Sequence, residues 1–306
     1  MTNNELQQLS IDFFQNSLDS SPTSAIMRGR KQYFDQIEEL NDETFEKETK
    51  AVNNFILRLE SIDPKSLSNR EKVTHGMLEF ALNSNKDSLL DKSWEFGAGV
   101  SGFTGFLIDY NQQMFVPDSE SADMLLKRLE LYERLYTQIA EVQRTGLKNN
   151  RVATKRNLLR TIDQLENYLG LSLEEDPLLL INFSPEISES FISDWKEKAK
   201  KIIDSNIRPT VLTYLEQLKL DHIPKGRSDE QSGIIWIDGG EETYLRSLRK
   251  YTGHKNITVK EVHEVGLSEI ERLKEEFFEI GENVFPWSQH SRRSLTKNAN
   301  RAFNEI

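Results

Sequence analysis

Hydrophobic residues recur at steps of three and four along most of the chain, which is the spacing of amphipathic α-helices. The clearest case runs from Thr258 to Ile280, where an apolar stripe alternates with a face rich in glutamate. Thr258 and Glu261 match a capping box, because each side chain can bond the other residue's free backbone N–H. The sequence therefore predicts a helix start at Thr258. The stripe consists of Val259, Val262, Gly266, Ile270, Leu273, Phe277 and Ile280.

The same spacing predicts further helices, which breaker residues separate. Ser68 and Glu71 form a second capping box. Gly170 is expected to end one helix, and Ser184-Pro185-Glu186 is typical of a helix start with proline in the first turn. The expected helices cover residues 4–18, 25–39, 42–61, 68–82, 125–142, 152–169, 184–206, 211–218 and 241–250, with Arg208-Pro209 marking a kink or a break.

Two apolar stretches depart from the helical spacing. Ile234–Ile237 is β-branched or aromatic and stops at Asp238-Gly239-Gly240, which indicates a short buried strand or extended segment. Trp94–Tyr110 is rich in glycine, which favours a loop or short hairpin with an extended element near Phe103–Ile108. The whole pattern predicts a mainly α fold, a multi-helix array with one or two short strands or hairpins.

Composition narrows the classes of function. The 306 residues carry 39 Lys+Arg against 50 Asp+Glu, a net charge of -11, which argues against nucleic-acid binding. The chain has no cysteine, which excludes disulfides, thiol nucleophiles and cysteine-based zinc sites. No window approaches the ~20 apolar residues of a membrane span, and the N-terminus does not resemble a secretory signal. We therefore expect a cytoplasmic protein that binds neither nucleic acid nor membrane.

His263-Glu264 begins like the H-E-x-x-H helix of a zinc peptidase, but the position of the second histidine holds Leu267. Leucine cannot bind zinc, so we expect His263 to be a structural or cleft-facing residue rather than a ligand. The other histidines lie in unrelated contexts. They are His75, His222, His254 and His290.

Gly97, Gly99 and Gly102 satisfy the dinucleotide-binding pattern G-x-G-x-x-G. That site needs an apolar strand before the first glycine and a helix after the last. The residues before Gly97 do not form such a strand pattern. A closely packed turn is therefore the better interpretation.

One long string of residues carries a resemblance to a known family. The string is Tyr244-Leu245-x-x-Leu248-Arg249-x-Tyr251-Thr252, then Ile257-Thr258-x-x-Glu261-Val262-His263-x-x-Gly266-Leu267-x-Glu269-Ile270-x-Arg272. It resembles the bacterial domain of unknown function 885, whose members look like zinc metallopeptidases of the gluzincin type. Weaker similarity extends upstream and covers most of the chain. It runs through Asn206-Ile207-Arg208-Pro209 and Arg144-Thr145-Gly146 to Ser21-Pro22-Thr23-Ser24.

The resemblance implies that this chain holds one half of a longer arrangement. Family members are about twice as long, and their H-E-x-x-P-G-H zinc motif lies in the C-terminal half. Residues 1–285 would then be the N-terminal helical region, with possible sub-units 1–118 and 119–285, and would have no cofactor of their own. This half would form a substrate-cleft wall and scaffold without activity, partnered by a separate C-terminal half or by self-association through an exposed face. The expected cleft-lining residues are Trp236, Gly239, Gly240, Tyr244 and His263.

The segment 286–306 differs in charge from what precedes it. It holds four basic side chains against the single acid Glu305, and the family pattern is hard to follow there. Two hypotheses fit this divergent basic tail: the end of an interrupted gene, or an ordinary exposed basic segment. An alternative function for the whole chain is a stand-alone helical binding or scaffold protein.

Overall fold

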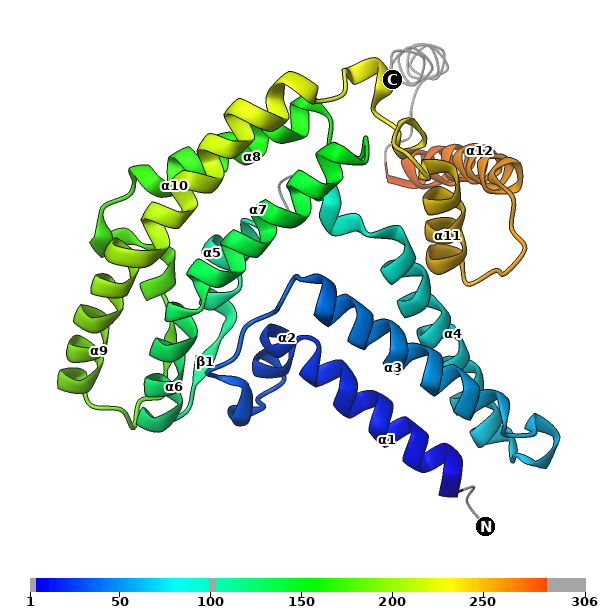
Figure 1. Cartoon of the computed structure of the whole chain (residues 1–306). Helices are drawn as coiled ribbons and strands as arrows, with labels where there is room; N and C mark the ends of the chain where they lie inside the picture. Colours follow the sequence, from blue (N-terminus) through cyan, green and yellow to red (C-terminus); the bar gives the residue numbers. More distant parts are fainter. Residues whose placement is uncertain (1–3, 99–102, 285–306) are drawn as a thin grey trace. The chain divides into compact units, whose positions relative to one another are not determined.

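The computed structural model describes residues 4–98 and 103–284, and it is mainly α-helical, as the sequence predicts (Figure 1). The chain divides into two compact units, which are Met1–Arg246 and Ser247–Ile306. The family boundaries expected at residues 118 and 285 stay predictions. The α-helices are α1 (Asn4–Asp19), α2 (Pro22–Met27), α3 (Asp42–Glu60), α4 (Asn69–Asp91), α5 (Gly105–Ile108), α6 (Ser119–Glu130), α7 (Tyr132–Lys148), α8 (Lys155–Gly170), α9 (Glu189–Ile202), α10 (Arg208–Gln217), α11 (Gly240–Thr252) and α12 (Val259–Val284).

Side-chain caps set several helix starts. Both predicted capping boxes are confirmed: Ser68 with Glu71 starts α4, and Thr258 with Glu261 starts α12. The start expected at Ser184-Pro185 is wrong, because α9 begins at Glu189 with Ser188 as its cap. The Ser188 hydroxyl accepts a bond from the Phe191 N–H, so the cap lies four residues beyond the expected start.

Three helices of the first unit, α1, α3 and α4, lie side by side around a small apolar core of their own (Figure 1). Each contributes residues at helical spacing, so that one stripe of every helix is buried. These core residues are Leu6, Leu9, Phe55, Leu59, Ile62, Leu67, Leu78 and Leu82.

A larger core joins α6, α7, α8, α9 and α10. Its largest buried side chains are aromatic, and Trp195 donates from its indole N–H to the Ala122 carbonyl at 2.7 Å. The single helix expected over 125–142 is two helices, because Leu131 ends α6 and begins α7. The Leu131 N–H bonds the Arg128 carbonyl three residues back, which tightens the last turn of α6.

The chain stays helical from α9 to α10 through Arg208-Pro209. A π-helical turn at Ile203–Ile207 joins the two helices, and the Arg208 N–H bonds the Ile203 carbonyl five residues back. Proline has no N–H to donate, and the wider turn accommodates it without ending the helix. A second π-helical turn follows at Leu218–His222.

The described strands are short and lie outside the stretches where the sequence predicts extended structure. β1 (Phe115–Val116) pairs in parallel with β2 (Asn182–Phe183). The register places Phe115 opposite Asn182 and Val116 opposite Phe183. Two-residue strands give no alternating pattern for a sequence to reveal.

Both expected extended segments are wrong. Ile234–Trp236 is a 3₁₀ turn, in which the Ile237 N–H bonds the Ile234 carbonyl at 3.1 Å. The stretch Phe103–Ile108 contains the short helix α5 instead of an extended segment. At both places backbone N–H groups bond carbonyls three or four residues back, as in helical turns, instead of a partner strand.

Two further expectations fail at glycines. The helix expected over 25–39 is only α2 and a 3₁₀ turn at Lys31–Tyr33, because Gly29 after α2 has a φ of +74°. Residues 36–40 then have no regular secondary structure. Gly170 is the last residue of α8 rather than a left-handed residue beyond it.

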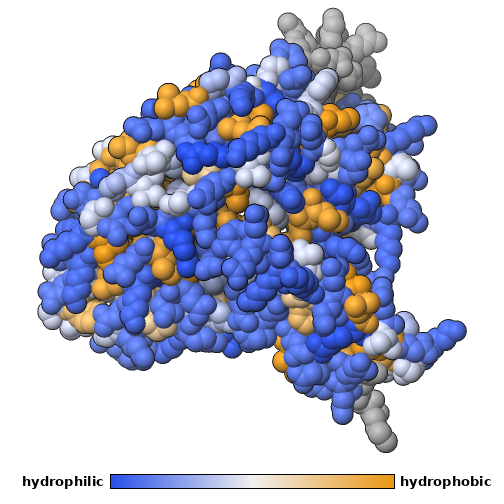
Figure 2. Space-filling view, viewed as in Figure 1, coloured by the Kyte–Doolittle hydropathy of each residue, from blue (hydrophilic) through white to orange (hydrophobic). Residues whose placement is uncertain are grey.

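The second unit contains α12, whose apolar stripe is exposed. Ile270 is 39%, Leu273 44% and Phe277 77% exposed. Elsewhere, the face in Figure 2 is mainly hydrophilic, with hydrophobic side chains in scattered groups. Among the described residues, no helix is both long enough and apolar enough to cross a bilayer.

Candidate functional site

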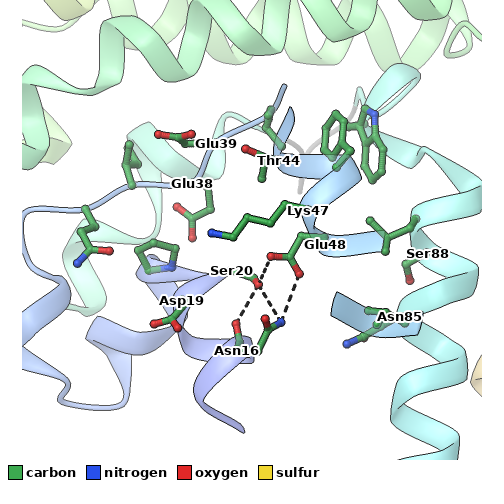
Figure 3. Close-up of a pocket in the computed structure, with 18 of the residues that line it drawn as sticks. Asn16, Asp19, Ser20, Glu38, Glu39, Thr44, Lys47, Glu48, Asn85 and Ser88 are labelled. Atoms are coloured by element: carbon green, nitrogen blue, oxygen red, sulfur yellow. Dashed lines mark hydrogen bonds between the residues drawn. The ribbon is translucent and has the colours of Figure 1, made fainter. Parts of the chain in front are cut away.

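A pocket of about 750 Å³ opens in the first unit, beside the ends of α1, α3 and α4 (Figure 3). Its walls come from the end of α1, the irregular segment 35–40, and one face each of α3 and α4, and Leu131 and Arg134 close it. The aromatic rings of Phe45 and Trp94 stack at one side, with centroids 4.0 Å apart. We call this the acidic pocket, because its lining carries Asp19, Asp35, Glu38, Glu39 and Glu48 against Lys47 and Arg134.

One wall of the acidic pocket is fixed by a buried polar network. Glu38 accepts from the Thr23 backbone N–H at 3.0 Å and from the Thr23 hydroxyl at 2.7 Å. The Arg128 side chain is fully buried, lies 3.9 Å from Glu38, and donates to the Thr23 hydroxyl and the Gln36 carbonyl. A buried guanidinium needs such partners, so this network holds residues 36–40 against α6.

Polar contacts also join α1 to α3 at the opposite wall (Figure 3). Ser20 donates to Glu48 at 2.7 Å, and Asn16 donates to the other oxygen of Glu48 at 3.4 Å. Lys47 extends from α3 toward Glu38 (Figure 3). Asp19 accepts from the Tyr33 hydroxyl, and this hydrogen bond raises the pKa of Tyr33, so the phenol stays protonated.

The acidic pocket presents several hydrogen-bond acceptors that suit a cation. The carboxylates outnumber the cations, and Glu39 is already paired with Arg134 at 2.7 Å. Amide and hydroxyl groups of Asn85, Ser88 and Thr44 add neutral hydrogen-bonding partners (Figure 3). An ammonium or guanidinium group would therefore find acceptors here.

Four of the predicted cleft residues lie together in the first unit, but none of them lines the acidic pocket. Trp236 is 54% and Tyr244 42% exposed. Gly239 has a φ of +70°, and a Cβ on Gly240 would lie 1.8 Å from the Ile234 carbonyl oxygen. The two glycines therefore serve a tight turn before α11, and their cleft-lining role stays a prediction.

His263 lies on the exposed surface of α12 in the second unit. Zinc does not fit the residues around it, because one helical turn later the chain has Leu267. Within residues 4–98 and 103–284, no group of three His, Cys, Asp or Glu side chains is arranged to hold a metal ion. His222 is buried, and burial lowers the pKa of its ring.

Two of the upstream residues that carry the family resemblance, Thr23 and Arg208, make buried polar contacts. Thr23 belongs to the Glu38 and Arg128 network. Arg208 pairs with the buried carboxylate of Asp176 at 3.0 Å. The acidic pocket itself was missed, because its carboxylates are spread from α1 to α3 without a short motif, and only the fold brings them together.

Comparison with known proteins finds a family and a solved structure that match most of this chain. A family model described as "Bacterial protein of unknown function (DUF885)" matches residues 22–305. A crystal structure described as the "putative lipoprotein from Colwellia psychrerythraea" superposes with a TM-score of 0.73 at 16% identity, which shows a shared fold. The alignment covers 90% of this chain and 51% of that protein, so the chain spans about half of its length. No curated protein matches the chain.

Proposed function

We propose a function from the premise that this chain belongs to the DUF885 family. The chain is the N-terminal, non-catalytic half of a protein that resembles zinc metallopeptidases. In this role it forms a substrate-cleft wall and scaffold. The observation that carries the proposal is the match of nearly the whole chain to about half of a longer protein with the same fold. The zinc and the general base would belong to the other half, so the chain alone has no peptidase activity.

The exposed stripe of α12 supports this proposal. A helix with large apolar side chains facing solvent is typical of a surface that another polypeptide covers. Ile270, Leu273 and Phe277 are each more than a third exposed. We infer that a C-terminal half of the family type is the partner that covers them.

The test measures zinc content and peptide hydrolysis of the purified chain, first alone and then mixed with a recombinant C-terminal half from a longer family member. We expect no stoichiometric zinc and no hydrolysis by the chain alone. We expect the mixture of the two halves to show more chelator-sensitive hydrolysis than the C-terminal half alone. Stoichiometric zinc together with chelator-sensitive hydrolysis by the chain alone would refute the proposal.

The acidic pocket favours a second candidate, a stand-alone binding protein. The pocket is complete within Met1–Arg246 and is large enough for a small molecule. In that case the chain binds a cationic ligand without any second polypeptide. Calorimetric titration of the isolated chain with a short lysine- or arginine-containing peptide separates the two candidates, because only the second requires binding here.

A further inference from the structure

A second pocket of the first unit, about 550 Å³ in volume, has a different chemistry. It shares Leu40 and Trp94 with the acidic pocket, and the rest of its lining is aromatic, small or neutral polar except for Ile234 and Arg227. We call it the aromatic pocket. The remaining lining residues are Ser93, Phe96, Gly97, Ala98, Phe103, Phe106, Tyr110, Ala153, Asn157, Arg227, Ser232 and Ile234.

The buried core holds the aromatic wall in place. The Tyr132 hydroxyl donates to the Phe106 carbonyl, and the Tyr136 hydroxyl donates to the Phe103 carbonyl, each at 2.9 Å. Phe106 and Tyr110 pack edge to face with centroids 5.3 Å apart. Because both tyrosines are almost completely buried in α7, the wall is formed before any ligand arrives.

Arg227 is the one charged side chain of this lining. Its Nε donates to the Val152 carbonyl at 2.8 Å, and its Nη1 donates to the Gln231 and Gly233 carbonyls at 2.6 and 2.5 Å. These neutral carbonyls orient the guanidinium and leave its charge uncompensated. Among the described residues Arg227 has no carboxylate partner, and its Nη2 has no hydrogen-bond acceptor.

Neighbouring arginines differ from Arg227 in this respect. Arg156, on the first turn of α8, pairs with Asp229, and Arg151 pairs with Glu95 at 2.8 Å. In a chain with a net charge of -11, acidic partners are plentiful. An unpaired cation in an aromatic pocket therefore matches an anion that arrives from solution.

We propose that the aromatic pocket binds a small carboxylate with an aromatic or large apolar group, such as the C-terminal residue of a peptide. The carboxylate would accept from Arg227 and the Asn157 amide, and the apolar group would pack against Phe103 and Phe106. The volume falls within the range of small-molecule sites. The proposal is independent of the proposed function, because the pocket is complete within the first unit.

The test compares N-acetylphenylalanine with its amide, in which a neutral NH₂ group replaces the charged carboxylate oxygen. Ligand-observed NMR titration of the full chain is expected to show saturable binding of the acid and at least about tenfold weaker binding of the amide, since a charge-assisted hydrogen bond is lost. Equal binding of acid and amide, or no saturable binding of the acid at millimolar concentration, would overturn the proposal.

Three variants locate the site. Arg227→Gln should remove the preference for the acid, whereas Arg156→Gln removes an arginine outside the lining and should keep it. Arg227 also holds backbone carbonyls, so Ser232→Glu provides a second route that leaves Arg227 in place. This variant adds a negative charge at an exposed position of the lining. It should weaken binding of the acid at least about tenfold and leave binding of the amide unchanged. An unchanged preference in Ser232→Glu would place the binding elsewhere and refute the assignment.

Discussion

At the scale of single residues, Gly146 shows how a missing side chain lets two segments meet. A Cβ at this position would lie 2.2 Å from the Glu95 carbonyl oxygen and 2.8 Å from the Arg151 carbonyl oxygen. The Glu95 carboxylate pairs with Arg151 at 2.8 Å beside the same contact. The end of α7 can therefore touch the 3₁₀ turn Ser93–Glu95 only because residue 146 is glycine.

We expect Gly146→Ala to lower the free energy of unfolding by about 1–3 kcal/mol, because backbone atoms on two sides must shift to admit the methyl group. The matched control is Gly76→Ala in the interior of α4, where nothing lies within 4 Å of the added Cβ. At position 76 alanine should raise the free energy of unfolding by up to about 1 kcal/mol, because its helix propensity is higher than that of glycine. Urea unfolding followed by circular dichroism measures both changes, and an equal response of the two variants would contradict this account.

At the scale of elements, a buried ion pair ties α10 to the segment after α8. The carboxylate of Asp176 is fully buried and accepts from Nη2 and Nε of Arg208 at 3.0 and 3.3 Å. Its other oxygen accepts from the Leu178 N–H at 3.1 Å. Arg208 also donates to the Leu171 carbonyl at 2.9 Å and lies over the Tyr168 ring. Arg208 therefore holds the start of α10 against the end of α8.

Asp176→Ala should destabilise the chain by about 3–5 kcal/mol, because it leaves the Arg208 guanidinium largely buried without its counter-charge. Asp229→Ala breaks the exposed pair with Arg156, whose side chains are 62% and 55% exposed, and should cost less than about 1 kcal/mol. Thermal and urea unfolding of both variants check the difference. Similar losses in the two variants would mean that burial of the pair does not determine its contribution.

The helices show how far the sequence predicts this fold. Amphipathic spacing and capping boxes located α3, α4 and α12, because those signals are local to the chain. The break at Leu131 and the continuous helix through Pro209 were not predicted, because tertiary packing and a π-helical turn override the local preference. The acidic pocket could not be predicted at all, because Asp19, Glu38 and Glu48 meet only after folding.

At the scale of the whole molecule, α12 has the amphipathic pattern that normally indicates a buried helix, yet its stripe is exposed. Val259 is 47%, Phe277 77% and Ile280 61% exposed. The pattern correctly predicts the helix, but burial of its stripe requires a surface that packs against it. Under the proposed function that surface belongs to a C-terminal half, and in its absence a second copy of the stripe is the nearest substitute.

We therefore expect the isolated chain to self-associate at micromolar concentrations, because each large apolar side chain that becomes fully buried contributes about 1.5–3 kcal/mol. Replacing Phe277 and Ile280 by Glu should shift the chain to monomer, since two carboxylates would then have to be buried in the contact. Ser268→Glu, on the opposite face of α12, adds a charge without touching the stripe and should leave association unchanged. Sedimentation velocity across a concentration series measures all three chains. A wild-type chain that stays monomeric at every concentration, or a Ser268→Glu chain that dissociates as fully as the double variant, would show that the stripe is not a contact surface.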